Sequence, residues 1–225
     1  MTDTTRLAEK LTARFEDTLS GCLTNHNQIT LVVNPSHLLS ICEALRDEDD
    51  FSFSQLIDLC GVDYSAYGQV DWATNETTST GFSRGRSKTS VNINNEERFA
   101  VVYHLLSIQH NHRLRVRCYL PEENPKLPTV TKIWSSADWY EREAYDMFGI
   151  LFEGHPDLRR LLTDYGFIGH PFRKDFPLEG NVEVRYDPDK QKVIYEPVTI
   201  TNRVLVPRVI RDDNRYIPDE ESPDG

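Results

Sequence analysis

The sequence predicts an α+β fold: a small, largely antiparallel sheet packs with about three helices, and an extended C-terminal arm follows. Residues 112–120 alternate strictly between apolar and polar side chains, the pattern of a strand with one buried face. Residues 98–108 are apolar on both faces, as expected of a central strand. A short polar turn separates the two stretches, so we expect them to form a hairpin.

The remaining elements follow from the spacing of apolar residues and from the residues that end each run. The helices are expected at 6–20, at 37–46 after an N-cap at Ser36, and from about Thr129 to Phe148. The other strands are expected at 28–33, in 51–64 after a helical turn, at 182–186 and at 193–209. Gly149 is the expected stop of the third helix, because glycine adopts the left-handed conformation of a helix end without strain.

These elements divide the chain into three parts. Residues 1–150 form the predicted α+β core, interrupted by a polar insertion at 68–97 that carries a small basic cluster. Residues 151–180 form an irregular docking segment, and residues 181–225 form an extended, proline-punctuated arm. A loop as long as the insertion is unusual inside a compact domain.

Composition excludes several classes of protein. The 225-residue chain has a mean hydropathy of −0.54 and a formal charge of −11, which argues against nucleic-acid binding because such binding depends on neutralising phosphates. No apolar run is long enough to span a bilayer, and we expect no secretory leader. The four cysteines lack the spacing of a metal or disulfide framework, which favours free thiols in a reducing compartment.

The stretch 141–180 contains two Gly-His-Pro triplets, at 154–156 and 169–171, each followed by basic residues. It is too aromatic for a solvated linker and too interrupted by Gly and Pro for a regular element. Such a chain needs another surface to pack against, and a partner protein is the best candidate. The pairs Arg159-Arg160 and Arg173-Lys174, set among Leu, Phe and Pro, have the character of interface anchors.

Two enzyme interpretations of this stretch are less favoured. His155 and His170 supply metal ligands, with carboxylates nearby, but they stand far apart on irregular chain, and zinc ligands usually come in close pairs. Glu141 and Glu143 resemble an acid–base pair, but residues two apart on a helix do not face each other. A structural role for them, binding arginines or amides of the following segment, is favoured. Arg142 and Asp146, four apart on the same helix, are positioned to pair.

The residues of this stretch resemble a known signature. Its members are Glu141-Arg142-Glu143, Asp146-Met147-Phe148, His155, Arg159, Leu161 and Leu162. With the continuation to residue 180 and the upstream strings GVDY and RFAVVYHLLS, the chain is similar to the C subunit family (30 kDa type) of proton-pumping NADH–quinone oxidoreductase, respiratory complex I. The resemblance covers about half of the chain.

The resemblance implies a peripheral-arm component without a redox centre, packed beside the quinone-site D subunit and near the cluster-bearing B subunit. FMN, iron–sulfur clusters, NADH and quinone then belong to the complex, and this chain has no catalytic, cofactor-binding or metal-binding residues of its own. It reaches the membrane only through the complex, on the cytoplasmic face of the bacterial inner membrane. The interface residues that it implies are Glu141, Arg142, Glu143, Asp146, His155, Arg159, Arg160, His170, Arg173 and Lys174.

Two alternatives stay open at this stage. The first is the equivalent subunit of a related membrane-bound hydrogenase or ferredoxin-dependent complex. The second is a free-standing metal-dependent enzyme that uses His155 and His170.

Overall fold

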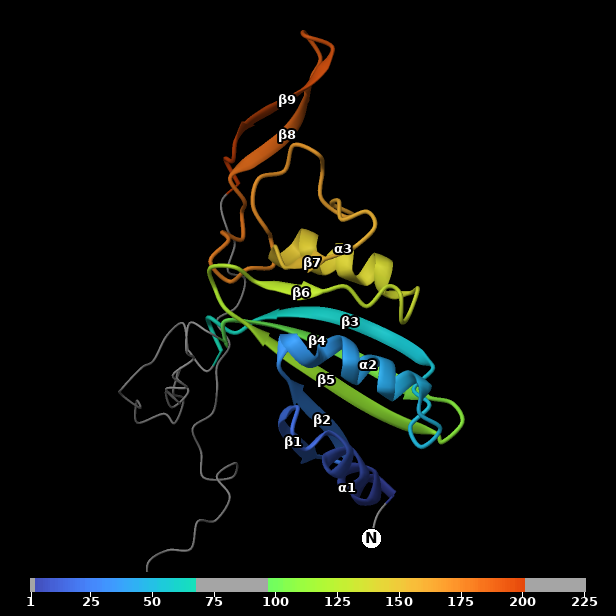
Figure 1. Cartoon of the computed structure of the whole chain (residues 1–225). Coiled ribbons are helices and arrows are strands. Elements are labelled where there is room, and N and C mark those ends of the chain that lie inside the picture. The colour runs from blue at the N-terminus through green and yellow to red at the C-terminus, as the bar shows by residue number, and fades with distance from the viewer. Residues whose placement is uncertain (1–2, 68–96, 201–225) are drawn as a thin grey trace, which may run out of the picture. The chain divides into compact units, whose positions relative to one another are not determined.

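The computed structural model describes residues 3–67 and 97–200 (Figure 1). The chain divides into two compact units, one of residues 1–65 and 93–178 and the other of residues 66–92 and 179–225. The first unit contains a mixed sheet with helices, which confirms the predicted α+β class. The predicted insertion at 68–97 lies, except for Glu97, outside the described residues.

The five-stranded sheet of the first unit has the strand order β1-β2-β5-β4-β3. Its strands are β1 (Leu19–Asn25), β2 (Gln28–Val33), β3 (Gln55–Asp63), β4 (Phe99–Ser107) and β5 (His112–Leu120). All neighbours run antiparallel except β2 and β5, so the sheet is largely antiparallel, as predicted. The sequence pattern did not predict strand β1.

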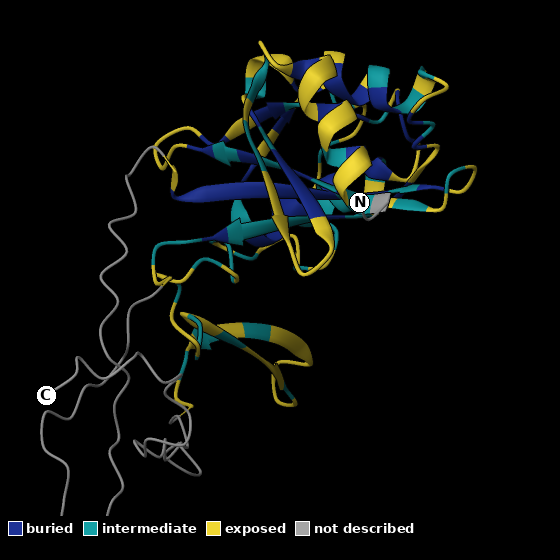
Figure 2. Ribbon diagram, turned by 90° about the horizontal axis from the view of Figure 1, so that it is seen from below, coloured by how far each residue is buried: buried dark blue, intermediate teal, exposed yellow. Residues whose placement is uncertain are grey.

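The predicted hairpin is confirmed as β4–β5. Leu114, Val116, Cys118 and Leu120 are all buried, whereas Arg113 is exposed. Strand β4 lies inside the sheet, between β5 and β3, and is buried on both faces over most of its length, as its two-sided apolar pattern predicts. In Figure 2 the buried residues accordingly lie mainly on the strands, and exposed residues lie on the outer helix surfaces.

Strand β3 contains a β-bulge. Leu56 and Leu59 are both buried although they are three residues apart, which a regular strand with a side-chain period of two does not allow. The ladder to β4 shifts register between Leu56 and Asp58, which leaves Ile57 as the extra residue. The helical turn expected at the start of 51–64 lies earlier: Phe51 and Ser52 donate to the Glu48 carbonyl, and Ser52, with a φ of 46°, ends the turn before β3.

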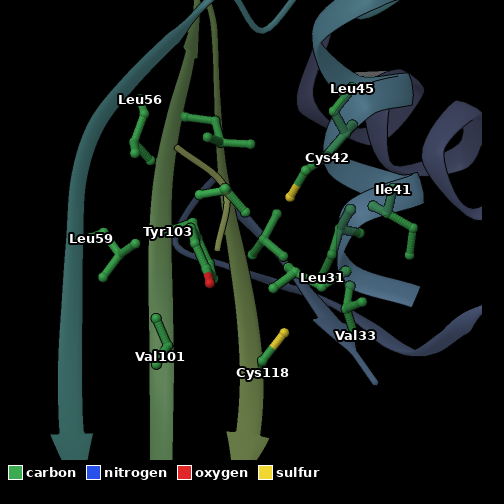
Figure 3. Packing of buried hydrophobic residues seen from close by; sticks show 14 of the residues in the cluster. Leu31, Val33, Ile41, Cys42, Leu45, Leu56, Leu59, Val101, Tyr103 and Cys118 are labelled. Carbon is green, nitrogen blue, oxygen red and sulfur yellow. The ribbon is translucent and has the colours of Figure 1, made fainter. Parts of the chain in front are cut away.

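Helices α1 (Asp3–Phe15) and α2 (Leu38–Asp47) pack against the core face of the sheet. Figure 3 shows the α2 side chains pointing at residues from β2, β3, β4 and β5. Helix α1 ends earlier than the predicted residue 20, because the chain turns into β1. The predicted cap at Ser36 is wrong: the Asn34 side chain accepts the Ser36 N–H and begins a short 3-10 helix, η1 (Pro35–His37), before α2.

The third helix, α3, spans Ala137–Phe148 and ends at Gly149, which has the predicted left-handed conformation (φ 75°). The predicted start near Thr129 is wrong. Thr129 follows a short strand, β6 (Lys126–Pro128), that pairs in parallel with β7 (Leu151–Glu153) after the helix. Buried Ile133, four residues before Ala137, fits the helical spacing, although the chain at Ile133 makes only a turn.

Within the second unit, β8 (Val182–Asp187) and β9 (Lys192–Pro197) form an antiparallel hairpin. The first of the predicted arm strands is confirmed, and the second ends at residue 197, well before the predicted 209. Residues beyond 200 lie outside the described part of the chain. No residue of either strand is buried, as the yellow and teal hairpin in Figure 2 shows.

Candidate functional site

The signature residues gather around α3, and the chain of residues 154–178 arches over this helix (Figure 1). Its contacts divide into those at the C-terminal end of α3, those nearer its N-terminal end, and those that fasten the far end of the segment to the sheet.

The C-terminal end of α3 is capped by the second Gly-His-Pro triplet. Nδ1 of His170 lies 2.9 Å from the Asp146 carbonyl oxygen, and Nε of Arg173 donates to the Phe148 carbonyl at 2.6 Å. The last carbonyls of a helix have no partner within the helix, so these contacts satisfy acceptors that would otherwise be lost. A Cβ at Gly149 would lie 2.6 Å from each of these two side chains, so only glycine allows the caps to approach.

Asp146 holds the middle of the segment. Its fully buried carboxylate accepts the backbone N–H groups of Leu161, Leu162 and Thr163 at 3.0, 2.7 and 2.8 Å. It also accepts the Thr163 hydroxyl and Nη1 of Arg160, the latter at 3.0 Å. Burial by itself raises the pKa of Asp146, but these hydrogen bonds outweigh it and lower the pKa to about 2.

The carboxylate of Glu141 is equally buried but has fewer donors. It accepts the Val130 N–H at 2.8 Å and the Thr129 hydroxyl at 2.5 Å, both from the turn that precedes α3. Burial outweighs these two bonds and raises the pKa of Glu141 to about 7. The prediction that Glu141 binds a backbone amide is therefore confirmed. The predicted position of that amide is wrong, because it precedes the helix and does not follow it.

His155 of the first triplet lies beside Glu141, with Nε2 3.9 Å from the carboxylate. Nδ1 accepts the Asp157 N–H at 3.0 Å, and Nε2 lies 3.1 Å from the Asp138 carbonyl oxygen. Nε2 also lies 3.1 Å from a carboxylate oxygen of Asp138, and because Nδ1 accepts a hydrogen bond, Nε2 is the ring nitrogen that carries the proton.

Arg142 and Asp146 do not pair, contrary to the sequence-based prediction. Arg142 instead donates to the carbonyl oxygens of Arg159 and Arg160, at 3.2 and 3.4 Å. Asp146 takes Arg160 as its partner. Tertiary contacts therefore replace a pairing within the helix that would contribute only a few tenths of a kcal/mol.

The far end of the segment is fastened by a cluster that the sequence-based site omitted. Asp63 accepts the Lys174 N–H at 2.9 Å and also pairs with Arg98, whose guanidinium reaches Asp175 at 2.8 Å. Burial by itself raises the pKa of Asp63, but the hydrogen bonds from Arg98 and the Lys174 N–H lower it overall. Asp63 lies in GVDY and Arg98 begins RFAVVYHLLS, so the signal was present in the two upstream strings.

The predicted site residues therefore occupy three environments. Glu141, Asp146 and the His155 side chain are buried, whereas Arg142, Glu143, Arg160, His170 and Arg173 are half-buried. Arg159 and Lys174 are exposed. His155 contacts the N-terminal half of α3 and His170 its C-terminal end, so the structure does not bring them together as ligands of one metal.

Large apolar side chains project from the same segment. They are Leu162, Tyr165, Ile168, Phe172 and Leu178, with exposed fractions of 61, 95, 78, 55 and 87%. Such exposed apolar residues on a segment fixed by many hydrogen bonds are common at interaction surfaces.

A sequence profile of the family described as "Respiratory-chain NADH dehydrogenase, 30 Kd subunit" matches residues 31–182. The chain belongs to this family. Relatives named as the C subunit of NADH-quinone oxidoreductase include those of Legionella pneumophila (strain Corby), 56% identical over 224 residues, and Coxiella burnetii (strain RSA 493 / Nine Mile phase I), 55% identical over 219 residues. The matches cover 99 and 96%, respectively, of both chains. This 30 kDa-type subunit is thus a component of the NADH–quinone oxidoreductase complex, complex I, as its signature residues indicate.

Solved structures include a trypsin-resistant fragment of Nqo5, 33% identical, with a TM-score of 0.47 over 68% of this chain and 98% of the fragment. A chain of the membrane-bound sulfane sulfur reductase, an archaeal respiratory membrane complex, is 18% identical with a TM-score of 0.53 and shares the fold. It covers 86% of this chain and is itself covered completely. Among the described residues, no helix of this complex I subunit is long and apolar enough to cross a membrane.

Proposed function

We propose that this complex I subunit is a docking component without a redox centre that supports the quinone-site D subunit and lies near the B subunit. In this role it holds the peripheral arm together while the complex passes electrons from NADH to quinone and translocates protons. The same proposal places it on the cytoplasmic face of the bacterial inner membrane, in contact with the membrane only through the complex.

This proposal rests on the exposed apolar side chains of residues 154–178. Hydrogen bonds to Asp146 and Asp63 hold this segment in place. Binding costs entropy when flexible groups become ordered, so a surface fixed in advance binds with a smaller loss. Tyr165, which is 95% exposed, combines a large apolar ring with a hydroxyl group, as is common in interface anchors.

The signature residues fall into two groups: some fix the conformation of the segment, and others are exposed to a partner. Those with internal partners, such as Asp146 and Arg160, shape the segment, whereas the exposed Arg159 and Lys174 are available to a partner. Arg159 is already oriented by Asp157 at 2.8 Å, an exposed pair that contributes little stability by itself. We assign Arg159 and Lys174 the polar contacts at the edge of the apolar surface.

The β8–β9 hairpin extends the proposed interface. Its exposed side chains include Val182, Val184, Tyr186, Val193 and Tyr195. An isolated two-stranded hairpin is at best marginally stable in water, so these residues need a surface to cover them. We propose that this surface belongs to the partner protein, as part of a docking arm that spans residues 181–225.

The cysteines support a role without a redox centre. All four are free thiols, with Cys42 and Cys118 buried in the core. An iron–sulfur cluster needs several cysteine ligands together. Among the described residues, the single group with metal-binding spacing contains only one cysteine. Relatives at 53–56% identity that carry the NADH–quinone name favour this complex over a hydrogenase.

The test replaces one exposed isoleucine of the segment and compares it with a matched isoleucine elsewhere. Ile168→Asp places a charge in the proposed interface, whereas Ile108→Asp changes a residue of similar exposure, 68% against 78%, at the β4–β5 turn. We expect Ile168→Asp to weaken assembly on the order of tenfold and to lower NADH–quinone activity in membranes in proportion. Ile108→Asp should assemble normally.

Activity per assembled complex separates docking from chemistry in the same experiment. The proposal requires that the turnover of each complex containing Ile168→Asp stays near that of the wild type. Normal assembly with a strongly reduced turnover would assign the segment to the quinone reaction and overturn a purely docking role.

A further inference from the structure

Three side chains on the sheet face opposite α1 and α2 form a cluster outside the docking site. Asp58 and Cys60 stand two residues apart on β3, and His104 lies directly opposite Asp58 on β4. A carboxylate oxygen, the sulfur and an imidazole nitrogen all lie within 4.8 Å of one another. Two ligands at i and i+2 on one strand and a third on the adjoining strand converge on one point because alternate side chains share a face.

The β-bulge creates this cluster. In a regular ladder Ile57 would pair with His104, and Asp58 would pair with Tyr103 on the core face. The extra residue at Ile57 instead places Asp58 opposite His104, on the same face as Cys60. Bulges of this kind commonly re-aim a side chain next to a functional site.

The three side chains are not occupied by other protein groups. Among the described residues, none of them makes a side-chain hydrogen bond or an ion pair. Arg115 lies directly across from His104 on β5, and its Nη2 donates to Gln28 at 2.8 Å on the opposite side from β3. Among the described residues, Arg115 makes no hydrogen bond or ion pair with these three side chains, although its charge is close enough to act on both Cys60 and His104.

The cluster is also accessible. Asp58, Cys60 and His104 are all half-buried, and Asp58 and His104 line a cavity of about 660 Å³. A small ion can reach Asp58 and His104 from this cavity, and water can supply a further ligand. One thiolate and one carboxylate together balance the charge of a divalent cation without a charged residue from elsewhere.

We propose that Asp58, Cys60 and His104 form a binding site for a borderline divalent transition ion, with Zn²⁺ as the best match. Sulfur, imidazole nitrogen and carboxylate oxygen are the three donor types that zinc takes in proteins, and three protein ligands leave a fourth position open. Zinc is redox-inert, so the ion would tie edge strand β3 to β4 and carry no electrons. This inference revises the sequence-based expectation that the chain binds no metal.

The experiment titrates the full chain, stripped of metal with a chelator, with Zn²⁺ alone and with Co²⁺ alone. We expect about one equivalent of Zn²⁺ to bind and Co²⁺ to give a thiolate-to-metal charge-transfer band. Cys60→Ser should abolish the band, and His104→Ala should weaken Zn²⁺ binding at least about tenfold. Cys22→Ser, at another half-buried cysteine, and His155→Ala should leave both signals unchanged.

A second measurement uses only the wild-type chain, in case a variant fails to fold. Bound Zn²⁺ should slow alkylation of Cys60 while leaving alkylation of Cys22 unchanged, as read by mass spectrometry. Saturable binding that survives Cys60→Ser, or equal alkylation of Cys60 with and without Zn²⁺, would overturn the proposal. Loss of the Co²⁺ charge-transfer band in His155→Ala would instead indicate that the metal binds at the docking segment.

Discussion

Two buried carboxylates on one helix, Glu141 and Asp146, behave in opposite ways. Both side chains are completely buried, and both lie beneath the segment of residues 154–178. The pKa of Glu141 is raised to about 7, whereas that of Asp146 is lowered to about 2. Burial alone therefore does not decide whether a carboxyl group is charged.

The difference lies in the number and kind of donors. Asp146 receives three backbone N–H groups, a hydroxyl and a guanidinium, whereas Glu141 receives one N–H and one hydroxyl. Nε2 of its neighbour His155 lies closer to Asp138, at 3.1 Å, than to the Glu141 carboxylate, at 3.9 Å. The C-terminal half of α3 thus holds the 154–178 segment through a carboxylate that stays charged at neutral pH, and the N-terminal half holds the preceding turn through a group that titrates near neutral pH.

The largest effect is expected for Asp146→Asn, which removes the charge with little change in shape. Arg160 then loses its ionic partner, and an amide NH₂ faces donors that need an acceptor. We expect the free energy of unfolding to fall by about 3–5 kcal/mol, the usual cost of removing one member of a buried pair. Denaturant unfolding at pH 7 measures this change.

Asp157→Asn is the matched control, because it removes the carboxylate of an exposed pair with Arg159. It should cost less than about 1 kcal/mol. The pKa of Asp146 is lowered from 3.8 to about 2, so its ionic stabilisation is present above pH 3.8 and is lost as the pH falls towards 2. Equal costs for the two variants at pH 7 would contradict the comparison.

The next effect concerns Glu141→Gln, which mimics the protonated acid. The folded pKa of Glu141, about 7, lies above its ordinary value of 4.5, so the charged form is disfavoured in the fold. Its contribution to stability is fully present below pH 4.5 and is lost as the pH rises through 7, by a total of about 3 kcal/mol. The glutamine side chain has no proton to lose, so the variant lacks this loss.

The measurement is the difference in unfolding free energy between wild type and Glu141→Gln at pH 4.5 and at pH 8. We expect this difference to change by about 3 kcal/mol in favour of the variant on going to pH 8. A difference that stays constant with pH would show that Glu141 is charged throughout, like Asp146.

A smaller effect is expected for Gly149→Ala, which tests the caps at the end of α3. The positive φ disfavours alanine by about 1–2 kcal/mol, and the new Cβ also displaces His170 and Arg173. Gly180→Ala has nearly the same φ, 76°, but nothing within 4 Å of the new Cβ. Thermal unfolding of the two variants should therefore show about 1 kcal/mol or more of additional loss at Gly149; no additional loss would mean that the caps contribute little.

Much of the fold follows from local patterns. Local causes explain three correct predictions. Burial of one or both strand faces explains the alternation in 112–120 and the apolar run of β4, and the φ required at the helix end explains the stop at Gly149. The start of α3 has no such local cause, because Thr129 and Val130 are held in a turn by Glu141 from later in the chain. Strands β6 and β7, three residues each, are too short for any periodicity to show.

The site was predictable as a set of residues but not as a set of contacts. The signature located Asp146, Arg160 and His170 along the chain, yet the partner of Asp146 depends on how residues 154–178 fold back over the helix. Asp63 and Arg98, far away in sequence, were missed for the same reason. The side-chain cluster at Asp58 depends on a bulge, and nothing in the spacing of the neighbouring leucines distinguishes a bulge from an irregular turn.

The ion pair of Asp63 and Arg98 has a consequence for the length of the segment between these two residues. The two residues flank residues 64–97 and join the end of β3 to the start of β4, where Asp63 is also paired with Phe99 in the ladder. The entropy cost of closing a loop rises only with the logarithm of its length, about 0.6 kcal/mol for each doubling. Once the two ends are clamped, insertions and deletions between them are almost neutral for the core. We therefore expect this position to tolerate changes in length, including an added affinity tag, without disturbing the sheet.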